Sequence, residues 1–222
     1  MHYSLDFSWL AEAASTIAEG AVTTIFLIAV AATLGTVISI LGASGRRSRL
    51  KPVRWLVSFY VELIRNTPFL VQLFFIFFGL PAIGLRLDGM TAAILAMTIN
   101  LGAYGTEIVG AGLDAVPEGQ SEAAIALGLK RYRVFVTIVL PQALKVIFPA
   151  LTSQLVIMML ESAVVSQIAV RELTYEADLL QARTFRAFET YFIVTLVYLA
   201  LSIGLRRLLV ASGNRFLSGG VS

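Results

Sequence analysis

The sequence predicts an all-α integral membrane protein with five transmembrane helices. Composition is the first observation, because 58% of the 222 residues are hydrophobic and only 14% are charged. Soluble domains are about half apolar and about one quarter charged. The second observation is a set of five long apolar stretches, each close to the length that crosses a bilayer as a helix. The third is the one-sided distribution of Lys and Arg along the chain.

The five predicted spans account for most of the chain, and no linker, low-complexity tract or second soluble domain separates them. A spanning helix needs about 20 mostly apolar residues at a rise of about 1.5 Å each. The first twenty residues carry Asp6, Glu12 and Glu19 and lack a basic start. We therefore expect a retained first helix, preceded by a short amphipathic surface helix, instead of a signal peptide. The whole chain, 1–222, is expected to be one transmembrane domain with spans near 21–41, 53–79, 90–111, 146–168 and 191–209.

The positions of Lys and Arg predict the orientation of these spans. Twelve of them fall in the segments 46–54, 130–145 and 206–215, whereas four fall in the alternate segments, at positions 86, 171, 183 and 186. Basic residues are enriched on the cytoplasmic side of membrane proteins. We therefore predict that the N-terminus lies outside, that the C-terminus is cytoplasmic, and that the loop at about 113–145 is cytoplasmic.

The residue inventory excludes several kinds of chemistry. There is no cysteine, so the chain has no disulfide, thiolate nucleophile or cysteine metal site, and the single histidine, His2, is terminal. We therefore expect no catalytic site and no metal site. The basic turn at 42–51 lacks the spacing of a Walker A nucleotide-binding loop, and no other stretch supplies one. If ATP drives this protein, a partner chain must bind it.

The second predicted span contains the polar string Glu62-Leu-Ile-Arg65-Asn66-Thr67-Pro68. Pro68 removes a backbone donor and is expected to kink the helix. Glu62 and Arg65 are three residues apart and are expected to pair on one face. The string is either a kink with a structural ion pair or a broken helix whose freed backbone groups line a translocation path.

The third predicted span carries Asn100, Tyr104 and Glu107 on one helical face, at positions i, i+4 and i+7. Polar groups in lipid are costly, so this face should look into protein or a water-filled cavity. Its role is either substrate contact or hydrogen bonding between helices. The fourth span carries the lone carboxylate of Glu161, which needs a cation, hydrogen-bond donors or a proton. A bound amino group or Arg65 could be that partner.

The segment from Glu118 to Pro141 is the longest organised stretch between two spans. Ser121 is expected to cap a short helix that opens at Glu122, and Gly128 is expected to end it. A basic cluster and an apolar run follow, which is typical of an amphipathic piece at a membrane surface. The segment is either an ordinary amphipathic surface loop or a docking element for another protein, and its organisation favours the second.

The spacing of this segment resembles the "EAA" loop of the permease subunits of bacterial ABC importers. The matching positions are Glu122, Ala123, Ala124, Gly128, Ile138, Leu140 and Pro141. The strings Arg65 to Pro68 and Asn100 to Glu107 are similar to the polar amino acid uptake branch of that family, with Asn66 in place of a usual glycine. Where the branch often has a lysine and an aspartate, this chain has Leu160 and Glu161, so one cation is missing. The resemblance covers about residues 16–210.

The resemblance implies a type I ABC importer permease fold and a transport subunit that is not an enzyme. Such permeases work in pairs, so this chain would form half of the pathway for a polar or charged amino acid, beside a second copy or a homologous permease. The implied candidate pocket consists of Thr67, Asn100, Tyr104, Glu107, Leu160 and Glu161. The implied location is the bacterial cytoplasmic (inner) membrane, which the chain crosses several times.

The resemblance also implies partners. A dimer of ABC ATPase subunits would dock on the cytoplasmic loop and carry ATP and magnesium, so no cofactor is expected in this chain. An extracytoplasmic amino-acid-binding protein would deliver the substrate, and membrane lipid would surround the spans. No nucleic acid is expected to bind.

Two other classes of protein are alternatives to this interpretation. An ion-coupled secondary transporter or channel would need no ATPase and could use Glu107 and Glu161 as ion sites. An intramembrane enzyme would need a catalytic cluster within the spans, and the sequence offers none. The segment 171–189 mixes both charges and is expected to be a solvated loop, with contact to the extracytoplasmic binding protein as the alternative.

Overall fold

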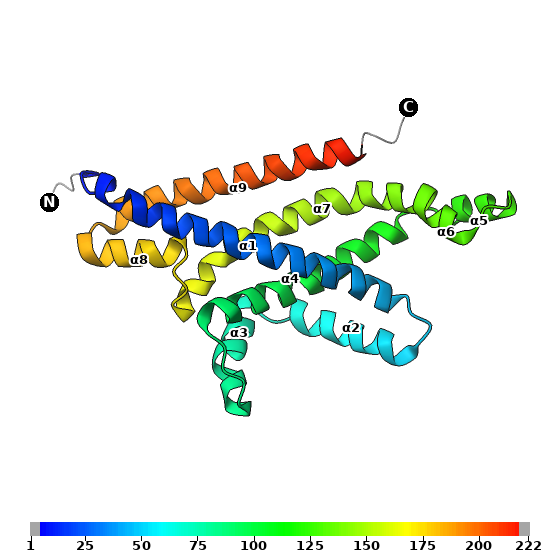
Figure 1. Cartoon of the computed structure of the whole chain (residues 1–222), viewed down its shortest axis with the longest axis horizontal. Coiled ribbons are helices and arrows are strands. Elements are labelled where there is room, and N and C mark those ends of the chain that lie inside the picture. The colour runs from blue at the N-terminus through cyan, green and yellow to red at the C-terminus, as the bar shows by residue number, and fades with distance from the viewer. Residues whose placement is uncertain (1–4, 218–222) are drawn as a thin grey trace.

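The computed structural model describes residues 5–217, and most of them are helical (Figure 1). His2 lies outside the described residues. Within residues 5–217 there is no strand, which confirms the all-α prediction. The four longest helices lie along roughly the same axis in Figure 1, with the chain in α7 running opposite to the chain in α1. They are α1 (Leu10–Arg46), α4 (Gly89–Asp114), α7 (Leu140–Glu161) and α9 (Ala187–Leu217).

Four helical segments of the described chain are long and apolar enough to cross a membrane, and there are up to five if the bent pair α2 and α3 is one span. The segment that contains α7 also includes α6 (Arg131–Val134), the π-helical turn η3 (Phe135–Val139) and the 3-10 segment η4 (Ser162–Ile168). α1 has 37 residues, which is about 55 Å of helix and more than a bilayer core of about 30 Å. The separate surface helix expected at 6–19 is wrong, because residues 10–19 are the first turns of α1.

The second apolar segment is broken in its middle. α2 (Lys51–Arg65) and α3 (Phe69–Phe74) lie on either side of Pro68. The helical segment Phe69–Ile83, which α3 opens, is bent by 110° relative to α2. Pro68 has no N–H and disfavours helical angles in the residue before it, so it can start α3 but cannot continue α2. The predicted kink is therefore a complete break. The chain continues through η1 (Phe75–Gly79) and η2 (Leu80–Ile83), and this arm projects away from the long helices in Figure 1.

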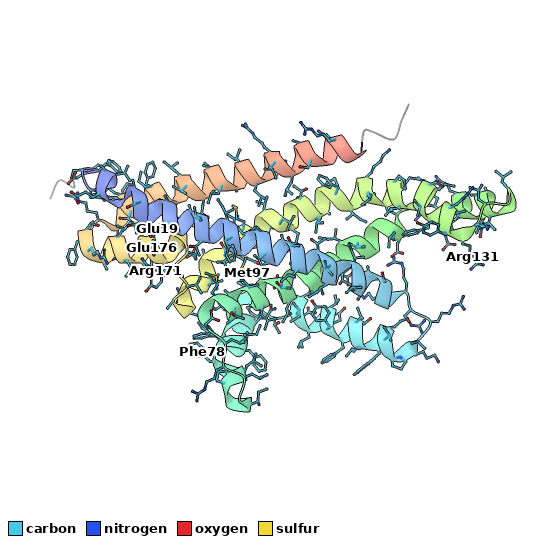
Figure 2. The ribbon with its side chains drawn as sticks, in the orientation of Figure 1. Glu19, Phe78, Met97, Arg131, Arg171 and Glu176 are labelled. Carbon is cyan, nitrogen blue, oxygen red and sulfur yellow. The ribbon has the colours of Figure 1, made fainter. Side chains whose placement is uncertain are left out.

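α1 and α4 pack closely because glycines line their contact. A Cβ atom at Gly105 would overlap the side chain of Ser39, and one at Gly42 would overlap Thr106. Small residues of this kind let two membrane helices approach and gain van der Waals contact. Around this contact, the fully buried side chains of the main core include Leu27, Leu73, Met97 and Leu101. Met97 lies near the middle of the bundle in Figure 2.

A smaller core closes one end of the molecule. α8 (Leu173–Thr184) packs against α1 and α9, and we call residues 5–24 together with 171–198 the α8 cap. The expectation of a solvated loop at 171–189 is wrong, because Glu172, Glu176 and Glu189 in this segment are buried. The core of the α8 cap consists of Ala13, Ile17, Leu173, Ala177, Leu180 and Val194.

The opposite end carries a helical hairpin, residues 117–141, which we call the α5 hairpin (Figures 1 and 2). α5 (Glu118–Ala126) begins directly after Pro117, so the cap expected at Ser121 is wrong. Gly128 has a φ of +85° just after the end of α5, in the left-handed region that glycine adopts without strain. The predicted end of the short helix at Gly128 is confirmed.

Candidate functional site

A polar cluster fills the break between α2 and α3. The side-chain amide of Gln72 donates to the carbonyl oxygen of Ile64 at 2.7 Å and to both oxygens of Thr67, its carbonyl and its hydroxyl, at 2.9 Å each. The amide of Asn100 on α4 donates to the Gln72 Oε1 atom at 3.0 Å. Gln72 and Asn100 are only 8% and 4% exposed. Backbone oxygens that the break leaves free are therefore satisfied by the Gln72 side chain from α3, which Asn100 on α4 holds in place.

Gln72 was not among the residues that the sequence analysis selected. It is the single polar side chain in the apolar run Phe69–Gly79, four residues after the helix-breaking proline. A lone amide in such a run is a usable signal, because a polar group in lipid needs a partner. We call the assembled group the break site, and it consists of Arg46, Arg65, Thr67, Gln72, Asn100, Tyr104 and Glu107.

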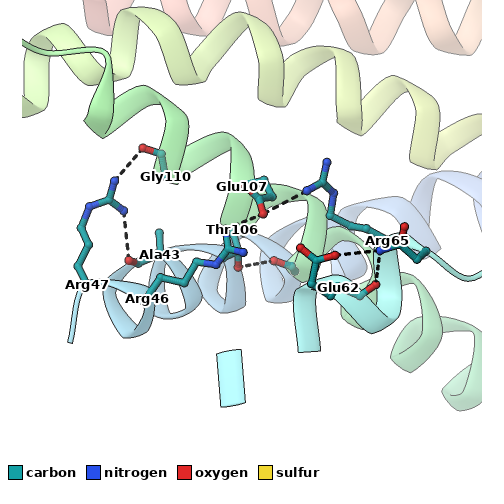
Figure 3. A network of polar contacts seen from close by, with 10 residues as sticks. Ala43, Arg46, Arg47, Glu62, Arg65, Thr106, Glu107 and Gly110 are labelled. Carbon is teal, nitrogen blue, oxygen red and sulfur yellow. Dashed lines mark hydrogen bonds and ion pairs between the residues drawn. The ribbon is translucent and has the colours of Figure 1, made fainter. Parts of the chain in front are cut away.

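The charged part of the break site is a network that joins three helices (Figure 3). Glu107 on α4 pairs with Arg46 at the end of α1, at 2.5 Å, and with Arg65 at the end of α2, at 3.1 Å. The Arg65 guanidinium also lies 5.6 Å from the centroid of the Tyr104 ring. The predicted ion pair between Glu62 and Arg65 is wrong, because Glu62 accepts hydrogen bonds from the following Asn66 side chain instead.

The network leaves positive charge available. Two guanidinium groups share one carboxylate, so the pairing of Arg46 and Arg65 with Glu107 does not neutralise both cations. These three side chains are 27%, 40% and 31% exposed, which lets a polar solute reach them. Guanidinium groups bind carboxylates through charge-assisted hydrogen bonds, and Tyr104 adds an aromatic face beside them. The partly exposed guanidinium groups of the break site are therefore able to bind a carboxylate group.

Leu160 and Glu161 do not make polar contact with the break site. Leu160 at the end of α7 is 50% exposed. Glu161 is half-buried, and within residues 5–217 it forms no ion pair or side-chain hydrogen bond. Arg65, which the sequence analysis offered as its partner, binds Glu107. Thr67, Asn100, Tyr104 and Glu107 thus come together around the break, whereas Glu161 takes part in none of the ion pairs of the described residues.

The α5 hairpin presents the residues of the predicted docking element. Glu122, Ala123, Gly128 and Pro141 are exposed, whereas Ala124 is buried. Ile138 lies in η3 and Leu140 opens α7, and both are half-buried. The Gln142 amide on α7 donates to Gln120 Oε1 on α5, which ties the hairpin to the long helix behind it.

The outer surface of the α5 hairpin is apolar and basic. Leu127 is 82% exposed and Tyr132 is 77% exposed. Arg131 lies at this end of the molecule in Figure 2, far from Glu19, Arg171 and Glu176 at the other. Exposed apolar surface is found where proteins contact other proteins or a membrane.

The α8 cap contains carboxylates that serve the fold. Glu172 accepts from the backbone N–H of Tyr175 at 2.9 Å and from the Tyr198 hydroxyl at 2.6 Å, which caps α8 and ties it to α9. Burial raises the pKa of the Glu172 carboxyl, and the hydrogen bond from Tyr198 opposes that shift. The buried carboxylate of Glu176 pairs with Arg171 at 2.7 Å. Within residues 5–217, no group of three or more His, Cys, Asp or Glu side chains is arranged to hold a metal ion.

Long apolar helices around a polar break, with an exposed hairpin at one end, are typical of a membrane-embedded component of a transport system. The chain belongs to the family described as binding-protein-dependent transport system inner membrane component, whose model matches residues 35–217. It is therefore a transport subunit and not an enzyme, as the sequence analysis predicted.

Two relatives from Bacillus subtilis (strain 168) are similar over most of their length. The chain is 39% identical over 172 residues to the probable glutamine ABC transporter permease protein GlnM, which is 78% of each chain. It is 35% identical over 199 residues to the arginine transport system permease protein ArtQ, which is 89% of this chain and 91% of the relative.

Solved structures place the fold among type I ABC importer permeases, which confirms that part of the prediction. A crystal structure of an amino acid ABC transporter with histidines matches with a TM-score of 0.89 and 36% identity, over 96% of this chain and 100% of the other. An inward-facing structure of the MetNI methionine ABC transporter matches with a TM-score of 0.67 and 23% identity, over 93% and 96% of the two chains. The second match concerns the fold alone.

Proposed function

We propose that this chain is the membrane-spanning permease subunit of an ATP-driven importer of a polar or charged amino acid. The observation that carries the proposal is the break site, where a polar face of α4 meets an interrupted helix inside an otherwise apolar bundle. Broken helices of this kind supply the binding groups of transporters near the middle of the bilayer. The glutamine and arginine permeases similar to this chain support an amino acid as the cargo.

The chemistry of the break site suits an amino acid. Arg65 and Arg46 can receive a carboxylate, and Tyr104 and Asn100 flank them with an aromatic face and an amide. Thr67 offers its hydroxyl at the break. Leu160 and Glu161 belong to the proposed pocket from α7, as a separate group that makes no polar contact with the break site, and the Glu161 carboxylate suits an ammonium group. A cationic or zwitterionic amino acid fits this set of charges.

In this proposal, the α5 hairpin couples ATP hydrolysis by the partner subunits to movement of the spans. A dimer of ABC ATPase subunits binds ATP and magnesium and receives the hairpin in a groove. The exposed side chain of Glu122, in the middle of α5, contacts that groove, and the small residues Ala123, Ala124 and Gly128 keep the hairpin narrow. The exposed apolar side chains of Leu127 and Tyr132 support such a contact. Closure of the ATPases moves the hairpin, and the connection to α7 carries that motion to the spans.

The proposed assembly follows the predicted orientation. The chain is one permease domain over 1–222 that crosses the bacterial cytoplasmic membrane five times, with its N-terminus outside and its C-terminus in the cytoplasm. It pairs with a second copy or a homologous permease. An extracytoplasmic amino-acid-binding protein docks on the side of the α8 cap, and the basic residues of the α5 hairpin contact anionic lipid.

The test compares two glycines of the α5 hairpin in the complete transporter in proteoliposomes. Gly128→Ala introduces a Cβ atom at a φ of +85°, whereas the matched control Gly119→Ala does so in α5 at ordinary angles, and both positions are open within 4 Å. A left-handed non-glycine residue costs about 1–2 kcal/mol, so we expect Gly128→Ala to uncouple ATP hydrolysis from amino acid uptake and Gly119→Ala to leave both unchanged.

Two outcomes would contradict the proposal. Equal coupling in the two variants would remove the lever role of the hairpin. Uptake driven by an ion gradient without ATP would favour an ion-coupled transporter. In such a transporter Glu107 and Glu161 would be the ion sites.

A further inference from the structure

One face of α2 is polar along its whole length. Lys51, Arg54, Ser58, Glu62 and Arg65 are spaced at intervals of three and four residues, which places them on a single side of the helix. We call these five residues the α2 stripe. Ser58 is half-buried, and the other four are exposed.

The other faces of α2 have different surroundings. Val61 is buried, and the Tyr60 hydroxyl donates to the carbonyl oxygen of Ile99 at 2.6 Å, so this face packs on α4. A third face is apolar and exposed, with Trp55 and Phe59 stacked at 5.7 Å. That face suits lipid or protein contact. The α2 stripe lies between the packed face and the apolar face.

Lipid cannot be what the α2 stripe faces. Charged and hydroxyl side chains are costly in the hydrocarbon region. Long basic side chains such as Lys51 and Arg54 can reach the membrane surface from the end of the helix. Ser58 and Glu62 cannot, because they lie about 10 Å and 16 Å further along α2, at about 1.5 Å per residue.

The α2 stripe is continuous with the break site. Its last member, Arg65, belongs to the network with Glu107 and lies over the Tyr104 ring. Its first member, Lys51, opens α2 directly after the basic segment that follows α1. A solute that leaves the break site therefore meets polar side chains of both signs over the full length of α2.

We infer that the α2 stripe lines a water-filled passage through which the polar amino acid leaves the break site toward the cytoplasm. The inference rests on the proposed function for its substrate and direction, and on the structure for its location. Water and a zwitterionic solute satisfy the exposed charges of Arg54 and Glu62, which lipid would leave unpaired. The passage makes Ser58 a lining residue and places Phe59, its neighbour in sequence, outside the passage.

The chain has no cysteine, so a single introduced thiol is the only one it carries. We would prepare Ser58→Cys and the depth-matched control Phe59→Cys in the complete transporter, in inside-out membrane vesicles. Phe59 is 54% exposed on the apolar face, so exposure within one chain does not favour Ser58. A membrane-impermeant cationic methanethiosulfonate is the probe, because thiolates in water react with it and thiols in lipid do not.

We expect Ser58→Cys to react at least about tenfold faster than Phe59→Cys, since only the first thiol ionises in water. Equal rates, or a faster reaction at Phe59→Cys, would overturn the passage and indicate that a second permease covers the α2 stripe. Amino acid uptake is measured in right-side-out vesicles that carry the same variant, and it separates the two proposals. Uptake without reaction at Ser58→Cys contradicts the passage alone, whereas reaction without any uptake contradicts the proposed function alone.

Discussion

The break site and the α8 cap both contain glutamates within the helical bundle, but these glutamates differ in burial and in their partners. In the α8 cap, Glu172 and Glu176 are 0% and 2% exposed, and each has fixed partners. In the break site, Glu107 is 31% exposed and pairs with two arginines that are themselves partly exposed. One region encloses its carboxylates, and the other leaves its carboxylate within reach of a solute.

The contrast separates structural charge from functional charge. A buried carboxylate with several donors stabilises the helices that supply them, and its loss leaves those donors unpaired. A partly exposed network inside an apolar bundle adds less stability, because solvent screens it. Its presence there is better explained by the passage of a polar solute than by the stability of the fold.

Removal of the Glu172 side chain should have the largest effect, and that effect should be on stability. Glu172→Ala removes the cap of α8 and leaves the Tyr198 hydroxyl without its carboxylate partner, at a cost of about 3 kcal/mol. The measurement is the melting temperature of the purified complex in detergent. Glu12→Ala is the control, because Glu12 is an exposed glutamate on the first turn of α1. Equal melting temperatures for the two variants would show that the α8 cap does not depend on Glu172.

Removal of the Glu107 carboxylate should instead reduce transport. Glu107→Leu leaves Arg46 and Arg65 without their shared partner, and we expect a loss of about 2 kcal/mol in the transport step, or roughly thirtyfold in uptake rate. The melting temperature should change less than it does in Glu172→Ala. Asp114→Asn is the control, because Asp114 lies on the same helix as Glu107 and its exposed pair with Arg47 should contribute under about 1 kcal/mol, so uptake should not change. A loss of stability without a loss of uptake would reverse the comparison.

A smaller effect should appear in the pH dependence of stability. Burial raises the pKa of Glu172 above the ordinary value of a glutamate, so the folded chain holds this proton more tightly than the unfolded chain. The resulting stability is full below the ordinary pKa and is lost as the pH rises through the raised pKa. We expect the melting temperature to fall across that range in the natural protein and to fall less steeply in Glu172→Gln. Parallel curves for the two proteins would contradict the assignment.

Much of the architecture could be predicted because it depends on local sequence. The helix expected at 90–111 is observed as Gly89–Asp114, where Asp88 accepts the Thr91 N–H and caps its start. Pro68 marked the break because proline acts on its own backbone. The polar face of Asn100, Tyr104 and Glu107 followed from helical periodicity alone.

The errors arose where the partners lie far away in sequence. Segment 171–189 reads as a solvated loop because its charges are visible and their partners are not, since Glu172 binds Tyr198 and lies beside Thr24, 148 residues earlier. Glu62 and Arg65 are correctly spaced for a pair, but the network on α4 offers Arg65 a better one. Local spacing cannot rank such alternatives, because the stronger partner is set by tertiary packing.

The most direct test of the polar face of α4 is a comparison of two of its buried polar residues. Asn100 binds Gln72 at the break, whereas the hydroxyl of Thr98, two residues away, has no hydrogen-bond partner within the described chain. The measurement is ATP-driven amino acid uptake by equal amounts of assembled transporter that carries Asn100→Leu or Thr98→Val. Our account predicts that Asn100→Leu loses most of the uptake and Thr98→Val retains it. Full uptake by Asn100→Leu would contradict it.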